Sequence, residues 1–226
     1  MKIKHLSALL ISCALAACGS SEEDASRITL GAADTLITLN ALQYQQAFVV
    51  QVTDENMNPA PYTKVTITAR TLQYYKGQYE PYDTDGDGSA NRWEPNYSAA
   101  CTAEDINNNG VLDVGEDINN NGTLEPTNPI TISAHPSEIP TIIAGTGELV
   151  TDDSGFGYFV ATYPKSEAFW SYVRLTATAD VSGTENHETY SFILAVLVDD
   201  VSDLLTSPPG GIYSRYGSST SCTDTL

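Results

Sequence analysis

The sequence predicts an all-β protein: an antiparallel β-sandwich interrupted by an irregular, acidic loop insertion. Three observations carry this prediction. Short segments in which apolar and polar residues alternate recur along the chain, clusters of Asp, Asn, Gly and Pro separate them, and no stretch shows a sustained helical period. About seven strands at this spacing are typical of a sandwich.

The composition excludes one large class of partner. The 226 residues include 10 basic and 29 acidic side chains, so the formal charge at pH 7 is 10 − 29 = −19. A chain this acidic repels phosphate backbones, and we therefore expect no nucleic-acid partner. With only three histidines, a histidine-built transition-metal site is not expected either.

The first eighteen residues have the layout of a secretory signal. Two lysines precede a nearly apolar stretch, residues 6–17, which is shorter than the ~20 residues that a membrane-spanning helix needs. The ending LAAC, residues 15–18, resembles a bacterial lipobox, where cleavage exposes a cysteine that carries acyl chains. We expect residues 1–17 to be a lipoprotein signal peptide and Cys18 to be lipidated. The alternative is ordinary secretion with cleavage near Ala17.

An acylated Cys18 would attach the protein to a membrane of the cell envelope, because several acyl chains bind where one would dissociate. The residues after Cys18 are small or acidic, so 18–27 is expected to be a flexible tether. The lack of Asp directly after Cys18 favours the outer membrane in a cell that has one.

The sandwich is predicted in two halves. In residues 28–82, segments 46–53 and 64–69 place an apolar side chain at every second position and flank a turn at 54–61. Residues 129–199 repeat this style. The strands expected there are 147–151, 156–163, 172–179 and 190–198.

Two blocks of these halves resemble a known family. FVVQVTDENMNPAPYTKVTIT (48–68) and GELVTDDSGFGYFVATYPKSEAFWSYVRLTATADVSGTE (147–185) are similar to the bacterial Ig-like domains of the invasin and intimin group, called Big-1. The shared hallmarks are a V-x-V-x-D-x-x-x-x-P segment and a later T-D-x-x-G turn that opens a strand. The resemblance implies an Ig-like sandwich and a surface role in adhesion or structure.

The insertion, residues 83–128, differs from both flanks. It contains ten carboxylates and one arginine, a formal charge of −9. Within it recurs the twelve-residue template D-x-[DN]-x-[DN]-G-x5-E, in which an oxygen-rich loop surrounds Ca²⁺. Positions 1, 3 and 5 offer side-chain oxygens, position 6 is a Gly at a sharp turn, position 7 offers its carbonyl, position 9 often acts through water, and position 12 clamps with a carboxylate.

Three loops follow this template. Residues 83–94 and 105–116 fill it completely, and 117–128 repeats the second loop but ends at Asn128. An amide cannot clamp with two carboxylate oxygens, so we expect the third site to be weaker, six-coordinate, or completed by a neighbour such as Glu94 or Glu116. Recurring apolar residues, Ile106 with Ile118 and Leu112 with Leu124, are expected to pack the loops together. The predicted metal ligands are Asp83, Asp85, Asp87, Ser89, Asn91, Glu94, Asp105, Asn107, Asn109, Val111, Asp113, Glu116, Asp117, Asn119, Asn121, Thr123, Glu125 and Asn128.

Calcium is the expected cofactor, with two ions and a third if the last loop is completed. Hard oxygen ligands in a pliable loop suit a 6-to-8-coordinate ion, whereas Mg²⁺ requires a tighter octahedron. Pro81, Pro95 and Pro126 lie next to the loops, so the helices that flank a true EF-hand are not predicted. The loops are EF-hand-like or thrombospondin-type and should stiffen the insertion without acting as a switch. The alternative is a solvated Asn/Asp/Gly-rich loop without metal.

Two cysteines remain once Cys13 leaves with the signal and Cys18 carries lipid. A disulfide between Cys101 and Cys222 is predicted for an oxidising exterior, and the alternatives are free thiols or an intermolecular bridge. Residues 200–226, rich in Ser, Thr, Pro and Gly, are expected to be a loosely ordered tail.

No catalytic motif is present, and His135 and His187 are interpreted as surface residues. We therefore expect a non-enzymatic, lipid-anchored surface protein that has a structural or adhesive role and a protein or glycan partner. The alternative is an accessory ligand- or glycan-binding component of a surface enzyme or uptake complex. A sugar-stacking face could use Trp93 or Trp170, although packing in the sandwich core or on the insertion is the commoner use of such residues.

Overall fold

The computed structural model describes residues 27–136 and 147–224; the signal segment and Cys18 lie outside these residues. The described residues form nine strands and two short 3-10 turns, and among them no helix is long and apolar enough to cross a membrane. The elements are β1 (Ile28–Asn40), β2 (Gln43–Val52), β3 (Lys64–Tyr82), β4 (Arg92–Thr102), β5 (Thr131–Ala134), β6 (Glu148–Val150), β7 (Phe156–Pro164), η1 (Lys165–Glu167), β8 (Ser171–Val181), β9 (Thr184–Ile193) and η2 (Val198–Asp200).

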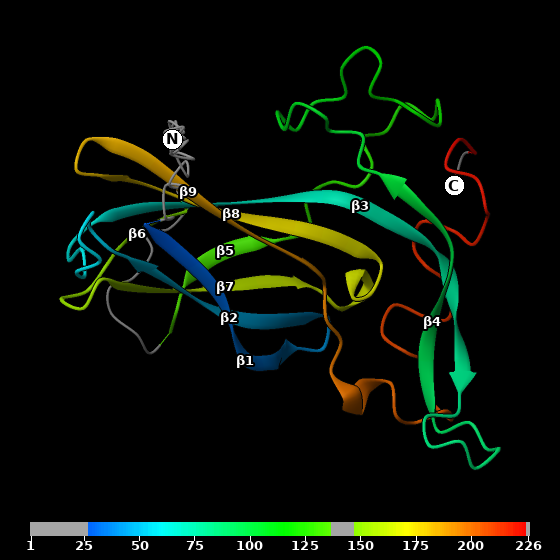
Figure 1. Cartoon of the computed structure of the whole chain (residues 1–226). Helices are drawn as coiled ribbons and strands as arrows, with labels where there is room; N and C mark the ends of the chain where they lie inside the picture. The colour runs from blue at the N-terminus through cyan, green and yellow to red at the C-terminus, as the bar shows by residue number, and fades with distance from the viewer. Residues whose placement is uncertain (1–26, 137–146, 225–226) are drawn as a thin grey trace, which may run out of the picture.

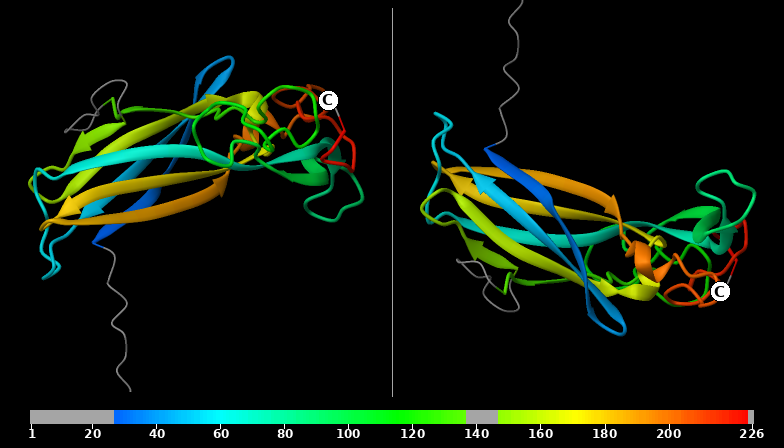
Figure 2. Two further views of the ribbon diagram at one scale, coloured as in Figure 1. Left: turned by 90° about the horizontal axis from the view of Figure 1, so that it is seen from above. Right: turned by 90° about the horizontal axis from the view of Figure 1, so that it is seen from below.

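The predicted all-β sandwich is confirmed. One antiparallel sheet has the strand order β1-β2-β7-β5 and the other β4-β3-β8-β9, with β6 paired to the start of β3. The two sheets face each other and enclose the main core (Figure 1, Figure 2). The alternating apolar residues of both halves meet there: Phe48 of β2 stacks on Phe159 of β7 at 5.4 Å, and Val65, Ile67 and Leu175 are buried.

β3 is much longer than the predicted segment 64–69. Its first part pairs with β8 within one sheet of the sandwich, and its second part leaves the sandwich and pairs with β4 (Figure 1). Register shifts after Thr71 and after Lys76 break the simple alternation on which the prediction depended. At the second shift Gly77 has a φ of +152°, and a Cβ there would meet the Asn96 carbonyl oxygen at 2.2 Å. Only glycine fits this bulge.

The insertion is not a single irregular segment, because β4 runs through its middle. Residues 83–91 form the turn between β3 and β4, whereas 103–130 follow the other end of β4 (Figure 1). A strand of 11 residues spans roughly 35 Å, so β4 separates the first loop from the other two. β4 was not predicted because Pro95, Asn96 and small residues give it no alternating pattern. A proline is tolerated here because β4 is an edge strand.

A second, smaller core lies under the outer part of β3. It is built from Tyr74, Tyr79, Cys101, Trp170, Val201 and Tyr216. Trp170 is 1% exposed and meets Tyr79 edge to face at 5.2 Å, while Trp93 packs on this core and donates its Nε1–H to the Thr206 carbonyl at 2.9 Å. Trp170 is therefore unavailable for a sugar-stacking face, and Trp93 is held by packing.

The expectation of a loosely ordered tail is wrong for residues 202–224. Tyr216 is buried in the second core, and Lys76, itself only 1% exposed, forms an ion pair with Asp224 at 2.6 Å. The predicted disulfide between Cys101 and Cys222 is confirmed, with Cα atoms 5.5 Å apart. These contacts join the end of the chain to β3 and β4, which lie far from it in sequence.

A buried carboxylate also holds this segment. Glu167, 1% exposed, accepts hydrogen bonds from Arg215 Nη1 at 2.5 Å, Ser171 Oγ at 2.6 Å and Tyr216 OH at 2.8 Å. Both of its oxygens are used, and because an amide has only one acceptor oxygen, Glu167→Gln should lower the free energy of unfolding by about 1–3 kcal/mol. Urea denaturation measures this. Glu55→Gln, in an exposed turn, is the control and should change stability by no more than about 0.5 kcal/mol; an equal loss in both variants would contradict the assigned role.

Candidate metal centre

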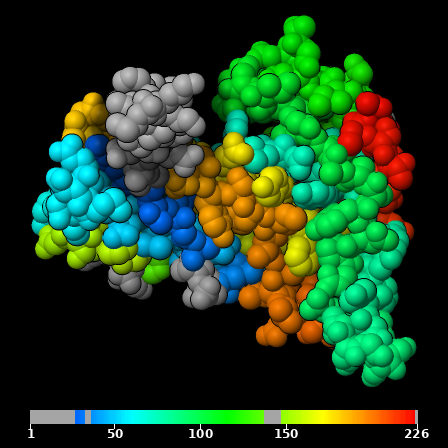
Figure 3. Space-filling view, viewed as in Figure 1, coloured from blue at the N-terminus to red at the C-terminus, as the bar shows by residue number. Residues whose placement is uncertain are grey.

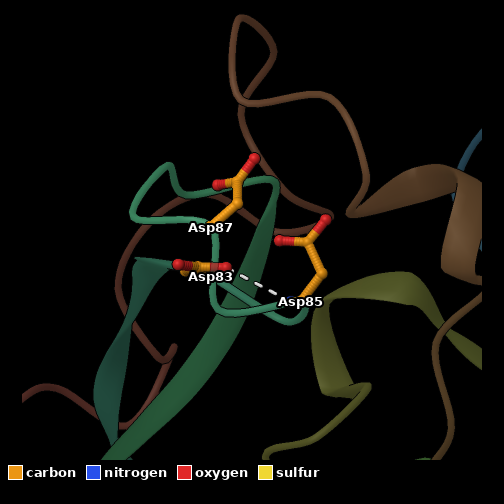
Figure 4. Close-up of side chains that lie close together, drawn as sticks. All are labelled: Asp83, Asp85 and Asp87. Atoms are coloured by element: carbon orange, nitrogen blue, oxygen red, sulfur yellow. Dashed lines mark hydrogen bonds between the residues drawn. The ribbon is translucent and has the colours of Figure 1, made fainter.

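Three aspartates of the first loop converge on the turn between β3 and β4. Each of Asp83, Asp85 and Asp87 offers a carboxylate oxygen, and these oxygens lie within 4.8 Å of one another (Figure 4). They occupy positions 1, 3 and 5 of the template, and Gly86 at position 6 has a φ of +76°. The sequence therefore brings the first three side-chain ligands of this loop together.

Backbone N–H groups hold two of these carboxylates in place. Asp83 accepts the N–H groups of Gly86 and Gly88, each at 2.7 Å, and Ser89 donates its N–H to Asp87 at 2.7 Å. The hydrogen bonds from Gly88 and Gly86 lower the pKa of Asp83, so this carboxylate is ionised at neutral pH. A cluster of carboxylate oxygens is an environment that attracts a hard cation.

The end of the first loop departs from the template. The side-chain oxygen of Asn91 accepts a hydrogen bond from the Thr84 hydroxyl at 3.0 Å, which connects the end of the turn to its beginning. Glu94, the predicted clamp, lies in β4 and forms an ion pair with Arg92, outside the aspartate group. Since β4 also separates Glu94 from residues 117–128, the expectation that it could complete the third loop is wrong.

The second loop folds around Asp105. Its two carboxylate oxygens accept the N–H groups of Asn109 and Gly110, both at 3.0 Å. The side-chain amides of Asn107 and Asn109 each donate to Asp113 at 2.8 Å. Positions 1, 3, 5 and 9 of this loop are thereby connected in one hydrogen-bonded network.

Glu116 joins the beginning of this loop to its ninth residue. It is 5% exposed, and its two oxygens accept the N–H groups of Ile106 and Asp113, each at 3.0 Å. The predicted twelfth position therefore does fold back onto its loop. Val111, at position 7, donates its N–H to the Asn109 side chain at 2.7 Å.

The third loop repeats this geometry up to position 9. Asp117 accepts the N–H groups of Asn121 and Gly122, both at 3.0 Å, and the amides of Asn119 and Asn121 donate to Glu125 at 2.6 and 3.1 Å. Thr123 donates its N–H to Asn121 at 2.7 Å, as Val111 does to Asn109 in the second loop.

Asn128 does not act as the twelfth position. Its side-chain amide donates to the Ala69 carbonyl of β3 at 2.8 Å, and its oxygen accepts the Ile130 N–H at 3.2 Å. The role predicted for Asn128 is therefore wrong in geometry, since these bonds attach the insertion to the sandwich. Glu104, outside this loop, accepts the N–H groups of Ile118 and Glu125, the second and ninth residues of the loop.

Glu104 is the residue that template matching missed. It is 0% exposed, and this burial raises its pKa. The signal that could have found it is a repeat that begins one residue before the template: EDINNNG occurs at 104–110 and again at 116–122. A glutamate thus precedes each of the two loops.

The loops are not held together by the recurring isoleucines as expected. Ile106 is 63% exposed, and Val111 and Val114 are also exposed, whereas Ile118, Leu112 and Leu124 are half-buried. The space-filling view shows residues 103–128 projecting from the body (Figure 3). Polar contacts therefore dominate the inside of this projection.

No family model matches this chain, and no curated protein or solved structure shows significant similarity to it.

Proposed function

We propose that this chain is a non-enzymatic, lipid-anchored protein of the cell surface, whose Ig-like sandwich carries calcium loops and has a structural or adhesive role. The observation that supports it most is the convergence of Asp83, Asp85 and Asp87 within 4.8 Å on a loop that follows the calcium template. The second and third loops support it further, because positions 1 to 9 of the template fold alike in both.

Calcium is favoured over other metals by the chemistry of the donors. The group contains only carboxylate oxygens, with no imidazole or thiolate, and its members lie in an exposed turn that can adjust its shape. Such donors suit Ca²⁺, which accepts irregular coordination at 2.3–2.6 Å. Zinc prefers nitrogen and sulfur, and Mg²⁺ prefers a rigid octahedron.

A stiffening role follows from where the loops lie. They occupy the two ends of β4, at the edge of the outer part of the β3 sheet, and no helix borders them in the described residues. Bound calcium would therefore not open a helix pair, as it does in sensor proteins. It would neutralise part of the −9 charge of residues 83–128 and fix the turns through which this edge could meet a partner.

A surface location is supported by two independent features. The lipobox-like ending at Cys18 supports acylation and an envelope membrane, the outer membrane in a cell that has one. The disulfide between Cys101 and Cys222 supports an oxidising compartment, because such bonds are rare in the cytosol. In an extracellular fluid that contains millimolar calcium, loops with a Kd of ~10⁻⁴ to 10⁻³ M would be occupied continuously.

Isothermal calorimetry tests the calcium proposal on a chain that begins at Ser20 and so contains every described residue. We expect two or three ions to bind, and the double substitution Asp83→Asn with Asp87→Asn should remove one of them. The matched control is Asp54→Asn, since Asp54 organises an exposed turn through the N–H groups of Asn56 and Asn58 but lies outside the insertion. The absence of binding to the unsubstituted chain at 10 mM Ca²⁺ would refute the proposal.

A further inference from the structure

The second and third loops each have two backbone N–H groups that donate to one buried glutamate. Glu116 ends the second loop and accepts the N–H groups of its second and ninth residues, Ile106 and Asp113. Glu104 precedes that loop, yet it accepts the N–H groups of the second and ninth residues of the other loop, Ile118 at 3.0 Å and Glu125 at 2.9 Å. The two carboxylates therefore accept hydrogen bonds from equivalent N–H groups in equivalent loops. Glu116 stands at the end of the loop that it contacts, whereas Glu104 stands before the loop that it contacts, with the whole second loop between them in sequence.

We infer that Glu104 is the closing carboxylate of the loop 117–125, in place of Asn128, and that residues 104–125 form one reciprocally closed pair. The calcium part of this inference rests on the proposed function. In each half of the pair a buried glutamate positions the backbone of a loop whose first residue, Asp105 or Asp117, carries the first side-chain oxygen of the template.

The position of Glu104 explains why it can serve a loop that begins thirteen residues later. Its own N–H donates to the Glu125 carbonyl at 2.8 Å, and the N–H of Ala103 donates to the Leu72 carbonyl of β3 at 3.0 Å. Glu104 is thus fixed to the sheet edge on one side and to the end of the third loop on the other. Asn128 is not available to close the loop, since the nitrogen and the oxygen of its side-chain amide are both hydrogen-bonded at the junction with β3.

Reciprocal closure predicts which amides each glutamate protects. In Glu104→Gln, one of the two acceptor oxygens becomes an NH₂ group that faces an N–H donor. The amides of Ile118 and Glu125 should then exchange with solvent about tenfold faster, and those of Ile106 and Asp113 should change little. In Glu116→Gln the pattern should be reversed.

Hydrogen exchange followed by NMR in EDTA measures this without any metal. The buried amide of Phe159 in β7 reports whether the sandwich is intact. Should Glu104→Gln fail to fold, Glu104→Asp keeps the charge but has a shorter side chain. It should still speed amide exchange at Ile118 and Glu125 more than at Ile106. The inference is overturned if Glu104→Gln exposes the loop 105–116 first, or if neither pair of amides responds.

Calorimetry with Ca²⁺ then tests separately whether Glu104 affects the calcium affinity of the third loop. Glu104→Gln should weaken the ion of the third loop at least tenfold, whereas Asn128→Ala should leave its affinity within about twofold. The reverse result would show that Asn128 is the closing residue. If the unsubstituted chain binds no calcium, the proposed function fails, but the exchange pattern in EDTA still decides whether the loops are closed reciprocally.

Discussion

Removal of calcium with EDTA should make residues 83–91 and 103–130 roughly tenfold more sensitive to protease, while the sandwich stays resistant. The insertion holds ten carboxylates against one arginine, so without a cation its loops are opposed by like-charge repulsion. At 5 mM Ca²⁺ and a Kd of ~10⁻⁴ to 10⁻³ M, each occupied loop gains about 1–2 kcal/mol of stability. A difference of 1.4 kcal/mol changes the population of the open form tenfold.

Limited chymotrypsin digestion followed by mass spectrometry measures this effect. Leu112 and Leu124 are half-buried cleavage sites inside the second and third loops, so cuts after them report directly on those loops. Tyr44 and Phe159 are fully buried in the sandwich and serve as internal controls. Equal amounts of Mg²⁺ should protect less than Ca²⁺. Identical cleavage rates in calcium and EDTA, or simultaneous cutting after Phe159, would contradict a local stiffening role.

The parts of the fold that could be predicted are those in which local pattern and final contacts agree. The end of β2, the start of β3 and β8 alternate because one face of each covers the main core. The aspartate triad was predictable for a similar reason: a calcium template is local, and the hydrogen bonds of Asp83 reach no further than Gly88.

The outer part of β3, β4 and the C-terminal segment could not be predicted in this way. Their stability comes from contacts distant in sequence, such as Tyr79 with Trp170, Glu167 with Arg215 and the Cys101–Cys222 disulfide. Tyr79 and Tyr216 gave no signal that a second core existed, because β-bulges and turns hide their spacing. Glu104 was missed because a linear template assigns the closing residue to the end of its own loop.

Loss of the disulfide should be the most destabilising change available outside the main core. Cys101 and Cys222 are 121 residues apart, and in the chain-entropy model a bond that closes a loop of this size stabilises the fold by about 4–5 kcal/mol. The double substitution Cys101→Ala with Cys222→Ala avoids burying a free thiol at Cys101, which is 1% exposed. Its free energy of unfolding in urea should fall by most of that amount.

The same variant should also show where the stability is lost. Because the disulfide joins the last residues to the end of β4, the second core should open before the main core, and the fluorescence of the buried Trp170 should change before the circular dichroism of the sheets. Treatment of the unsubstituted chain with a reductant should reproduce the result, and Lys76→Met, which removes only the ion pair with Asp224, provides the comparison.

Glu104 lies three residues after Cys101, so the amides of Ile118 and Glu125 should lose protection as well. A loss below about 1 kcal/mol, with both cores still unfolding together, would mean that the second core holds the C-terminal segment without the covalent bond.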